Sequence, residues 1–402
     1  MTKIVVTGMG QISALGHDLP AFREAIVAGH CGIAPIRPEL AGKLITKNAA
    51  EVRDYDPGGY FEPRVLATLD RFSQFAVIAA RQAANQAGLS PDAMSAGRIG
   101  VISGTGAGGL TTLDEAYLRL YGRGARVHPM TIPRFMISAA ASQVSMDLGL
   151  RGPVFSVSSA CSTSNHAIGT AMMLLRAGMA DAMLAGGSEA SFELGPMKSW
   201  EAMRVMAPDS CRPFSHDRRG MVLGEGAGML VLEREETARA RGAEILAEIA
   251  GFGFTADAED LVQPSAEGAA AAMRAAIVDA GLTAEGIDCV NAHGTGTVLN
   301  DVGEAQALYR ALGERAGTIP VTSTKSAHGH CLGAAGALEA IASIIGLAEG
   351  FVPATLNHTG TDPDIALDIV ANAPRALDYD TVLSNNLAFG GLNACVVIRR
   401  YA

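Results

Sequence analysis

Short apolar runs alternate with longer runs of helical period along the first half of the chain. The short runs cover residues 4–6, 99–103, 154–158, 182–185 and 229–233, and a β-strand is expected at each. The longer, alanine-rich runs cover residues 21–28, 72–87 and 162–177, and an α-helix is expected at each. Strands that alternate with helices in this way indicate an α/β fold.

The same rhythm starts again after residue 241. Strands are expected at 244–251, 289–292 and 394–399, and helices at 268–280, 303–312 and 335–346. Two glycine-rich turns that lead into apolar strands resemble one another, GEGAGMLVLER at 224–234 and FGGLNACVVIRR at 389–400. The pattern predicts a duplicated α/β unit, with one half at 1–240 and the other at 241–402.

The composition supports two packed halves and narrows the class of protein. Of the 402 residues, 49% are hydrophobic and 18% are charged, which is enough for a large core. The 47 glycines and the low aromatic content of 5% favour helices packed closely on sheets. No apolar run looks long enough to span a bilayer, and the N-terminal MTKIVVTGMG is typical of a strand rather than a signal peptide. We therefore expect a cytoplasmic protein.

Charge and cysteine content exclude further classes. The net charge of −10 disfavours nucleic acid and anionic membranes as partners, but it is compatible with an acidic protein that docks on a local arginine patch. The six cysteines include no CxxC pair, so neither a disulfide framework nor a cysteine zinc site is expected. Reduced thiols are expected instead, one of which could be catalytic.

Cys161 is the first candidate for chemistry. It follows the run VFSVSSA and comes just before residues 162–164, where the next helix is expected to begin. A thiol at a helix N-terminus faces unpaired N–H groups and the positive end of the helix dipole. Both effects should lower its pKa and favour the nucleophilic thiolate. The alternative is a small buried core residue.

Two glycine-rich segments carry the other candidates. NAHGTGTVLNDVGE places His293 where an apolar strand ends, a position favoured by catalytic groups, although a hydrogen-bonded structural histidine fits equally well. TSTKSAHGHCLGAAGALEA places Lys325, His328 and His330 in a loop before a helix. His328 and His330, with His293 and Cys161, also resemble a zinc set. Lys325 would repel the cation and no carboxylate lies close in sequence, so no metal is expected.

The N-terminal strand raises a dinucleotide-binding alternative. IVVTG precedes Gly8-Met9-Gly10, but the next glycine is Gly16, too far along for a G-x-G-x-x-G turn. No nucleotide cofactor is therefore expected.

Together these segments resemble the signature runs of the β-ketoacyl-acyl-carrier-protein synthases, the elongating condensing enzymes of the thiolase superfamily. The matching runs are VVTGMGQISALG near the start, the run at Cys161, LAGGSEA at 184–190, RPFSHDRRGMVLGEGAGMLVLE at 212–233, NAHGTGT at 291–297, TKSAHGHCLGAAGALE at 324–339 and SNNLAFGGLNA at 384–394. They span nearly the whole chain in the family's order. The chain is most similar to the second type of elongating synthase and its specialised bacterial relatives, such as the nodulation-type enzymes.

The resemblance implies a role for each catalytic candidate. Cys161 would be the acylated nucleophile, and the backbone N–H groups of Cys161 and Phe389 would form the oxyanion hole. His293 and His330 would support decarboxylation of a malonyl donor. Lys325 would order the two histidines and be held by Glu339, with Asp301 and Glu304 in support. Phe389 would also be the gating aromatic, and no organic cofactor would be required.

The resemblance also implies where substrate and carrier protein bind. Thr295 and Thr297 match threonines that hold the pantetheine arm. Ala107 and Thr131 stand where larger side chains often end the acyl tunnel, and Trp200 is a bulky residue that could refill that space. Other departures are His328, where a threonine is common, and Ala388, where a glycine commonly precedes the gating aromatic. The candidates for docking an acyl carrier protein are Arg64, Arg71, Arg123, Arg126 and Arg204.

The resemblance therefore predicts a thiolase-like five-layered α-β-α-β-α fold from two duplicated halves, assembled as a homodimer. The predicted reaction is acyl transfer to Cys161, followed by condensation with malonyl carrier protein. A degradative thiolase should carry a second catalytic cysteine in Cys-x-Gly, whereas Cys395 precedes Val396 and Val397. A non-catalytic chain-length partner subunit should lack the nucleophile, and a metal hydrolase should bind zinc.

Overall fold

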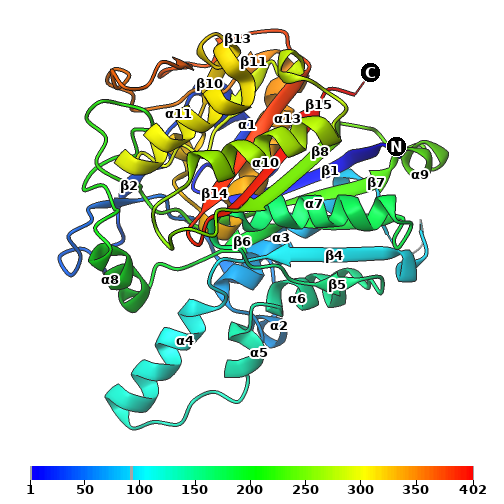
Figure 1. The fold of residues 1–402 in the computed structure, drawn as a ribbon. Helices are drawn as coiled ribbons and strands as arrows, with labels where there is room; N and C mark the ends of the chain where they lie inside the picture. Colours follow the sequence, from blue (N-terminus) through cyan, green and yellow to red (C-terminus); the bar gives the residue numbers. More distant parts are fainter. Residues whose placement is uncertain (1, 91–93, 402) are drawn as a thin grey trace.

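One mixed sheet of eleven strands runs through the computed structural model, which describes residues 2–90 and 94–401 (Figure 1). The order of its strands is β12-β10-β9-β14-β15-β8-β1-β7-β6-β4-β5. Their bounds are β1 (Ile4–Ser13), β4 (Ile99–Gly104), β5 (Val154–Phe155), β6 (Ala182–Glu189), β7 (Gly226–Arg234), β8 (Ala247–Ala256), β9 (Cys289–Asn291), β10 (Pro320–Thr322), β12 (Asp368–Ile369), β14 (Thr381–Ala388) and β15 (Leu392–Arg399). Two small sheets pair β2 (Ala34–Pro35) with β3 (Asn48–Ala49) and β11 (Phe351–Val352) with β13 (Arg375–Ala376).

The two ends of the large sheet repeat one arrangement. In the first half, β5, β4 and β6 are parallel, and β7 and β1 continue the sheet antiparallel. In the second half, β10, β9 and β14 are parallel, and β15 and β8 continue it antiparallel. The first strands of the two halves meet where Ile4 pairs with Ile249. The two similar glycine-rich runs of the sequence contain β7 and β15, which occupy equivalent places.

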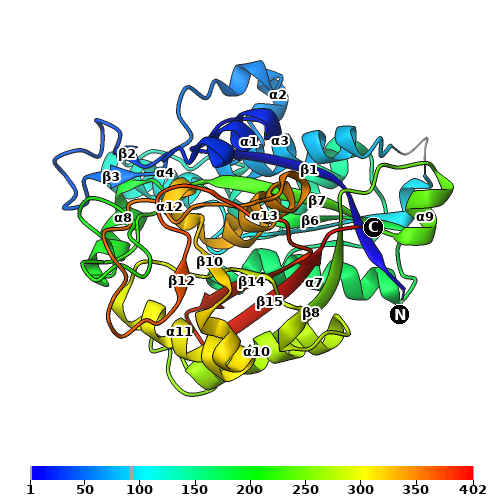
Figure 2. The same ribbon diagram turned by 90° about the horizontal axis from the view of Figure 1, so that it is seen from above.

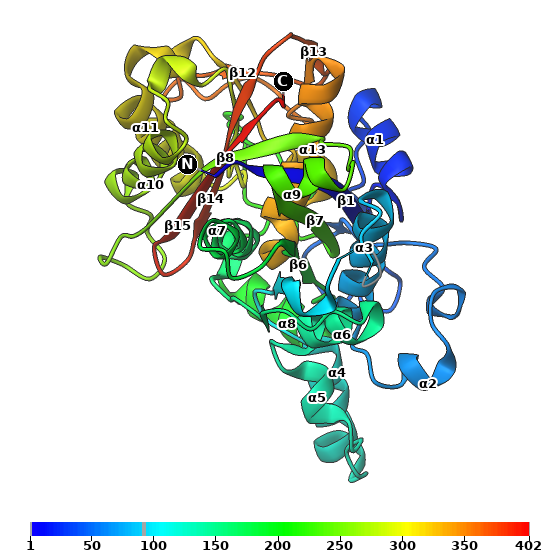
Figure 3. The same ribbon diagram turned by 90° about the vertical axis from the view of Figure 1, so that its right-hand side faces the viewer.

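Helices cover the outer faces of the two halves of the large sheet and fill the space between these halves. Their bounds are α1 (Leu19–Ala28), α2 (Pro63–Leu66), α3 (Arg71–Gln86), α4 (Leu110–Tyr117), α5 (Thr131–Phe135), α6 (Ala139–Leu148), α7 (Thr163–Arg176), α8 (Leu194–Ala202), α9 (Glu235–Ala240), α10 (Ala266–Asp279), α11 (Val298–Leu312), α12 (Lys325–His328) and α13 (Ala335–Glu349). Figures 2 and 3 show α3 and α6 outside the first half, α10 and α11 outside the second, and α7 and α13 between. The predicted five layers are confirmed.

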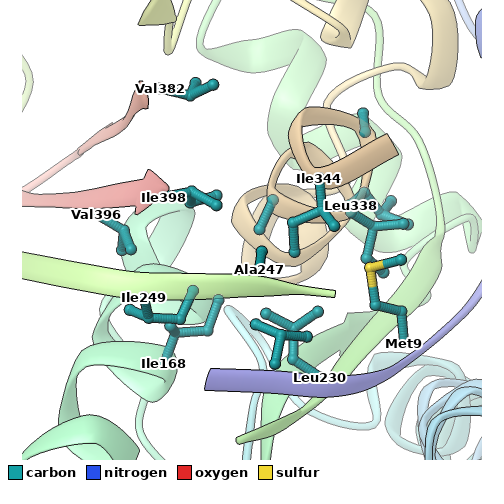
Figure 4. Packing of buried hydrophobic residues seen from close by; sticks show 14 of the residues in the cluster. Met9, Ile168, Leu230, Ala247, Ile249, Leu338, Ile344, Val382, Val396 and Ile398 are labelled. Carbon is teal, nitrogen blue, oxygen red and sulfur yellow. The ribbon is translucent and has the colours of Figure 1, made fainter. Parts of the chain in front are cut away.

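The central helix α13 shows how the core is built. Residues 335–347 are all buried, around the whole circumference of the helix, and all but Glu339 and Ser343 are apolar or glycine, as expected for a helix covered on all sides. Leu338 and Ile344 lie in one cluster with Leu230, Ile249 and Ile168, side chains from both sheet regions and from α7 (Figure 4). The stretch Leu332–Glu349 is long and apolar enough to cross a membrane by length and composition, so the statement that no run reaches that length was wrong. Because 89% of it is buried in the molecule, we assign it to the core.

The segment after β4 stands apart from the layers. Figure 1 shows α4 and α5 projecting from the body of the molecule. A turn of π-helix, η3 (Leu118–Gly122), follows α4 directly. Large apolar side chains of this projection are exposed: Tyr117, Leu118, Leu120, Tyr121 and Ile132. A single chain therefore leaves an apolar surface here uncovered.

Candidate active site

The nucleophile candidate lies in a tight turn at the start of a buried helix. Cys161 is the middle residue of the 3-10 turn η4 (Ala160–Ser162), and α7 follows at once. Ala160 adopts a left-handed φ of 48°, an uncommon conformation that indicates a turn held by its surroundings. The Ser162 hydroxyl lies 2.8 Å from the Asn386 carbonyl oxygen and 2.6 Å from that of Leu392. The turn is therefore fastened to β14 and β15, which come from the other half.

Two histidines converge on the Cys161 thiol. His330 Nε2 lies 3.1 Å from Cys161 Sγ. The rings of His293 and His330 meet edge to face, with centroids 5.5 Å apart and an interplanar angle of 84°. All three side chains are buried, and one ligand-type atom from each lies within 4.8 Å of the others. The predicted trio therefore meets in space although it comes from three separate segments.

The hydrogen bonds of His330 define its tautomer. The backbone N–H of Leu332 donates to Nδ1 at 3.3 Å, so Nδ1 is the accepting nitrogen. In a neutral ring Nε2 then carries the proton and points it at Cys161 Sγ. Burial, and then the charge of Lys325, hold the pKa of both His293 and His330 well below the usual value. Both rings are therefore neutral at physiological pH.

A buried ion pair supplies the positive charge beside these rings. Lys325, on α12, pairs with Glu339, on α13, and both side chains are fully buried. The other oxygen of Glu339 accepts a hydrogen bond from Asn386 Nδ2 at 2.7 Å. An isolated buried ammonium would be costly, so Glu339 is the group that makes Lys325 tolerable here. This arrangement agrees with the expected partnership of the two residues.

Asp301 and Glu304 are placed differently from expectation. Glu304 accepts the backbone N–H groups of His293 at 2.7 Å and Gly294 at 2.8 Å. Asp301 accepts that of Gly296 at 3.2 Å and that of Phe214 at 2.7 Å. Both carboxylates, buried on α11, therefore hold the glycine loop that carries His293, rather than the Lys325 ammonium. Burial raises the pKa of Asp301 to about 6 and that of Glu304 to about 7.

The expected lowering of the Cys161 pKa was wrong. The side chain is only 6% exposed, and burial raises the pKa of the thiol to about 12 against the opposing charge of Lys325. Desolvation of the thiolate therefore outweighs the helix N-terminus and the nearby cation in the resting protein.

The side chains around the thiol suit a metal ion poorly. Cys161, His293 and His330 could present three ligands, which is one fewer than a structural zinc site uses. His328, the other half of the predicted pair, is directed elsewhere: Nδ1 bonds the Gly329 carbonyl oxygen at 2.8 Å and Nε2 lies 3.1 Å from Thr324 Oγ1. The Lys325 ammonium already lowers the pKa of both histidines, and it would repel a cation in the same way. The donor set fits an acyl-transfer site better than a zinc site.

A cavity of about 270 Å³ leads to the thiol. Cys161, His293 and His330 line it together with the predicted substrate residues Thr295 and Thr297. Trp200 and Phe389 line it as well, and their rings stack with centroids 6.3 Å apart at 25°. The predicted gating aromatic therefore lies against the only tryptophan of the chain.

The predicted ends of the acyl tunnel are not part of this cavity. Ala107 is exposed on the single chain, and Thr131 is buried with its hydroxyl 2.6 Å from the His128 carbonyl oxygen. Apolar side chains around Cys161 come instead from a separate cluster that includes Phe192, Met197, Met221, Leu223 and Leu332. Ala107 can close a tunnel only if a second chain covers it, and that role stays a prediction.

The docking arginines fall into two groups. Arg64, Arg123 and Arg126 are exposed, and Arg204 is exposed at the cavity lining. Arg71 was wrongly included, because its guanidinium forms a two-bond pair with the buried carboxylate of Glu225, at 2.8 and 2.9 Å. A cation already neutralised in this way is not available to a partner.

Glu189 is a buried carboxylate that sequence reasoning did not single out. It accepts the backbone N–H groups of Gly106 at 2.7 Å and Gly333 at 3.0 Å, and burial raises its pKa to about 7. It therefore ties the loop after β4 to the segment that follows His330. Its signal was an acidic residue at the end of the otherwise apolar run LAGGSEA.

Comparison with known families gives two matches. The description "Beta-ketoacyl synthase, N-terminal domain" fits residues 1–238, and "Beta-ketoacyl synthase, C-terminal domain" fits residues 246–359. Nodulation protein E of Rhizobium sp. (strain N33) is 50% identical over 399 residues, 99% of each chain. The 3-oxoacyl-[acyl-carrier-protein] synthase 2 of Staphylococcus aureus (strain COL) is 38% identical over 407 residues, 99% of this chain and 98% of that one.

Solved structures of ketosynthases are also similar to this chain over its full length. A β-ketoacyl synthase from Burkholderia phymatum has a TM-score of 0.93 and 36% identity, with both chains fully covered. A type II polyketide ketosynthase, solved with its acyl-carrier protein, has a TM-score of 0.91 and 29% identity, again with full coverage of both chains. The degradative-thiolase alternative is not favoured by these matches, and Cys395 lies in the interior of β15.

Proposed function

Since this chain belongs to the β-ketoacyl synthase family and is a condensing acyltransferase, we propose the course of its reaction from the geometry of Cys161, His293 and His330. The three side chains share one cavity with the thiol at its buried end. An acyl group would be held covalently on Cys161 while a second substrate enters the same cavity. This order gives ping-pong kinetics.

In the first half-reaction Cys161 Sγ attacks the thioester carbonyl of an acyl carrier protein. The new carbon–sulfur bond forms as the bond to the pantetheine sulfur breaks, and the thiol proton leaves with the released pantetheine thiol. The high pKa of the buried thiol means that the proton is lost only as the new bond forms. Backbone N–H groups of Cys161 and Phe389, both at the cavity lining, are the proposed oxyanion donors.

In the second half-reaction a malonyl carrier protein binds against the acylated cysteine. Loss of carbon dioxide leaves an enolate, whose carbon attacks the acyl carbonyl and expels Cys161, which takes a proton from solvent. Neutral imidazoles that present N–H to the enolate oxygen stabilise charge that exists only after decarboxylation. The assigned Nε2–H of His330 and the neutral ring of His293 support this role.

The observation that carries the proposal is the 3.1 Å approach of His330 to the Cys161 thiol. The test is product formation from acyl and malonyl carrier proteins, followed by mass spectrometry of the carrier. We expect a 3-oxoacyl chain two carbons longer than the donor. If the donor and malonyl groups persist unchanged with every carrier tried, the proposed reaction is wrong.

We also propose that two copies of this chain form the working enzyme. The projection of α4, η3 and α5 exposes five large apolar side chains, and among the described residues β5 is the last strand at one end of the main sheet. One of the similar solved structures is described as the ishigamide ketosynthase/chain length factor, and this description supports a paired assembly. Light scattering should give twice the chain mass. Tyr121→Glu should lower that mass, whereas Val278→Glu, at an exposed residue of α10, should not.

The preferred acyl group and the compartment are proposals of the same kind. The higher identity to a nodulation protein than to the staphylococcal synthase supports a specialised acyl chain. Ala107 supports a longer tunnel once a second chain covers it. Ala107→Ile should then leave short-chain loading intact and block long chains, whereas equal loading would place the tunnel end elsewhere. A cytoplasmic location follows from the carrier-bound substrates and can be checked by cell fractionation.

A further inference from the structure

Glu189 is a fully buried carboxylate that meets three hydrogen-bond donors from two separate segments. It is the last residue of β6. Its Oε2 accepts the N–H groups of Gly106 at 2.7 Å and Gly333 at 3.0 Å, and its Oε1 accepts the Thr105 hydroxyl at 3.1 Å. A carboxylate accepts hydrogen bonds at both oxygens, whereas a carboxamide carries donor hydrogens on one of the two atoms. The three donors therefore fit a carboxylate and not a carboxamide.

The Gly333 peptide is held from two sides and has no room for a side chain. Its N–H donates to Glu189, and its carbonyl oxygen accepts the Ser164 hydroxyl at 2.5 Å. A Cβ atom at Gly333 would lie 2.4 Å from the Gly106 nitrogen, so the two backbone segments are in direct contact beside the carboxylate. The position of this peptide therefore depends on Glu189 from β6 and on Ser164 from α7.

Leu332, the residue before Gly333, donates the N–H that selects the tautomer of His330. Its nitrogen lies 3.3 Å from His330 Nδ1, a long hydrogen bond that a small displacement of the peptide would break. Leu332 has a left-handed φ of 44°, which is uncommon for a residue with a side chain and persists only where the surroundings hold it. Without the anchor on Gly333, the Leu332 backbone can relax, and Nδ1 is then free to carry the proton.

We propose that Glu189 is a positioning residue for the condensation: through the Gly333 peptide and the Leu332 N–H, it keeps the proton of neutral His330 on Nε2. The inference rests on the proposed function, because in that reaction the Nε2–H of His330 stabilises the enolate formed by decarboxylation. Glu189 is buried outside the cavity lining, so it acts on the reaction through His330 and not by touching substrate. Its loss should therefore slow decarboxylation only where His330 is present to donate.

A double-mutant cycle on the decarboxylation of malonyl carrier protein tests this dependence. Glu189→Gln places donor hydrogens among the three donors, and the kcat of decarboxylation should fall about tenfold, the typical value of one charge-assisted contact. In the His330→Ala background the same substitution should change kcat by less than about twofold, because the proton that Glu189 controls is gone. Additive losses in the two backgrounds would overturn the inference, since Glu189 would then act through Gly106 and Thr105 or through folding.

Glu233→Gln is the matched control. Glu233 is a fully buried glutamate of β7, and it accepts a hydrogen bond from Arg241 Nε at 2.8 Å. The control should keep decarboxylation within about twofold of the wild type, and a tenfold fall would overturn the inference by assigning the effect to loss of any buried charge. Should Glu189→Gln fail to fold, Ser164→Ala releases the same peptide from its other side. Its loss of kcat should again be absent in the His330→Ala background, and an additive loss would overturn the inference.

The tautomer itself can be observed by ¹⁵N NMR of protein labelled in its nine histidines, with the His330 signals identified by their absence from the His330→Ala spectrum. The wild-type ring should carry its proton on Nε2, and Glu189→Gln should add a population with the proton on Nδ1. An unchanged ring in Glu189→Gln would overturn this inference alone. Decarboxylation that is absent from the wild type, or unaffected by His330→Ala, would contradict the proposed function and this inference with it.

Discussion

The Nε2 atom of His330 lies 3.1 Å from Cys161 Sγ, while Nδ1 of the same ring accepts the Leu332 N–H at 3.3 Å. A backbone group therefore fixes which nitrogen carries the proton, and that proton faces the place where the substrates react. The ring acts as a hydrogen-bond donor without having to be charged.

Replacement of His330 should separate the two half-reactions. His330→Ala removes the N–H that faces the enolate, so decarboxylation and condensation should fall by about 10²–10³, the usual cost of one such donor. Acyl loading of Cys161 should fall much less, because the thiol itself remains. Single-turnover assays with labelled malonyl carrier protein measure the first quantity and intact mass measures the second. Equal losses in both steps would assign His330 to the activation of Cys161.

The pH dependence of thiol modification tests the state of the resting nucleophile. Because burial raises the pKa of Cys161 to about 12, the thiolate fraction should increase about tenfold per pH unit between about pH 7 and pH 10. The rate of alkylation by iodoacetamide, after subtraction of the rate measured for Cys161→Ala, should increase in parallel. A rate that levels off below about pH 8 would show that the thiolate is already formed in the resting protein.

Loss of the buried Lys325–Glu339 pair should destabilise the protein more than loss of an exposed ion pair. Lys325→Met leaves Glu339 buried beside uncharged groups, which should lower the free energy of unfolding by about 3–5 kcal/mol. Arg23→Ala breaks the exposed pair with Glu349 and should change it by less than about 1 kcal/mol. Urea titration measures both. Similar losses of unfolding free energy for the two variants would mean that the buried pair stabilises the protein no more than the exposed pair does.

The fluorescence of Trp200 should report movement of Phe389. The chain has one tryptophan, and its ring stacks on Phe389 in the cavity. Two left-handed glycines, Gly390 and Gly391, follow Phe389, so its turn can move more readily than α8. Acylation of Cys161 should therefore change the tryptophan emission, and Phe389→Leu should abolish that change. Phe254→Leu, which breaks another stacked pair away from the cavity, should not. If acylation leaves the emission spectrum unchanged, the rings of Trp200 and Phe389 stay stacked when Cys161 is acylated.

Much of the fold was predictable because its buried elements are strongly apolar. The helices predicted at 72–87 and 335–346 agree with α3 and α13 to within a few residues. The strand β14 was missed, because Asn385 and Asn386 interrupt its apolar pattern although both are buried. The strand expected at 154–158 has only two residues, because the chain then turns to present Cys161.

The residues that form the site were more predictable from the sequence than the burial and charge that surround them. Motifs pointed to Cys161, His293, Lys325 and His330, and the structure brings them together. The raised pKa of the thiol depends on how completely the surrounding elements exclude water, which no local pattern reports. The loss of Arg71 from the docking set likewise depends on a carboxylate 154 positions away. The division into halves at residue 240 stays a prediction.

The most direct test of the account is the mass of the intact protein after incubation with an acyl carrier protein. We predict that the wild-type chain gains one acyl group, mapped to the peptide that contains Cys161, and that malonyl carrier protein then removes it as the extended product. Cys161→Ala should gain nothing and form no product. An acyl group on any other residue, or extension by Cys161→Ala near the wild-type rate, would contradict the central claim.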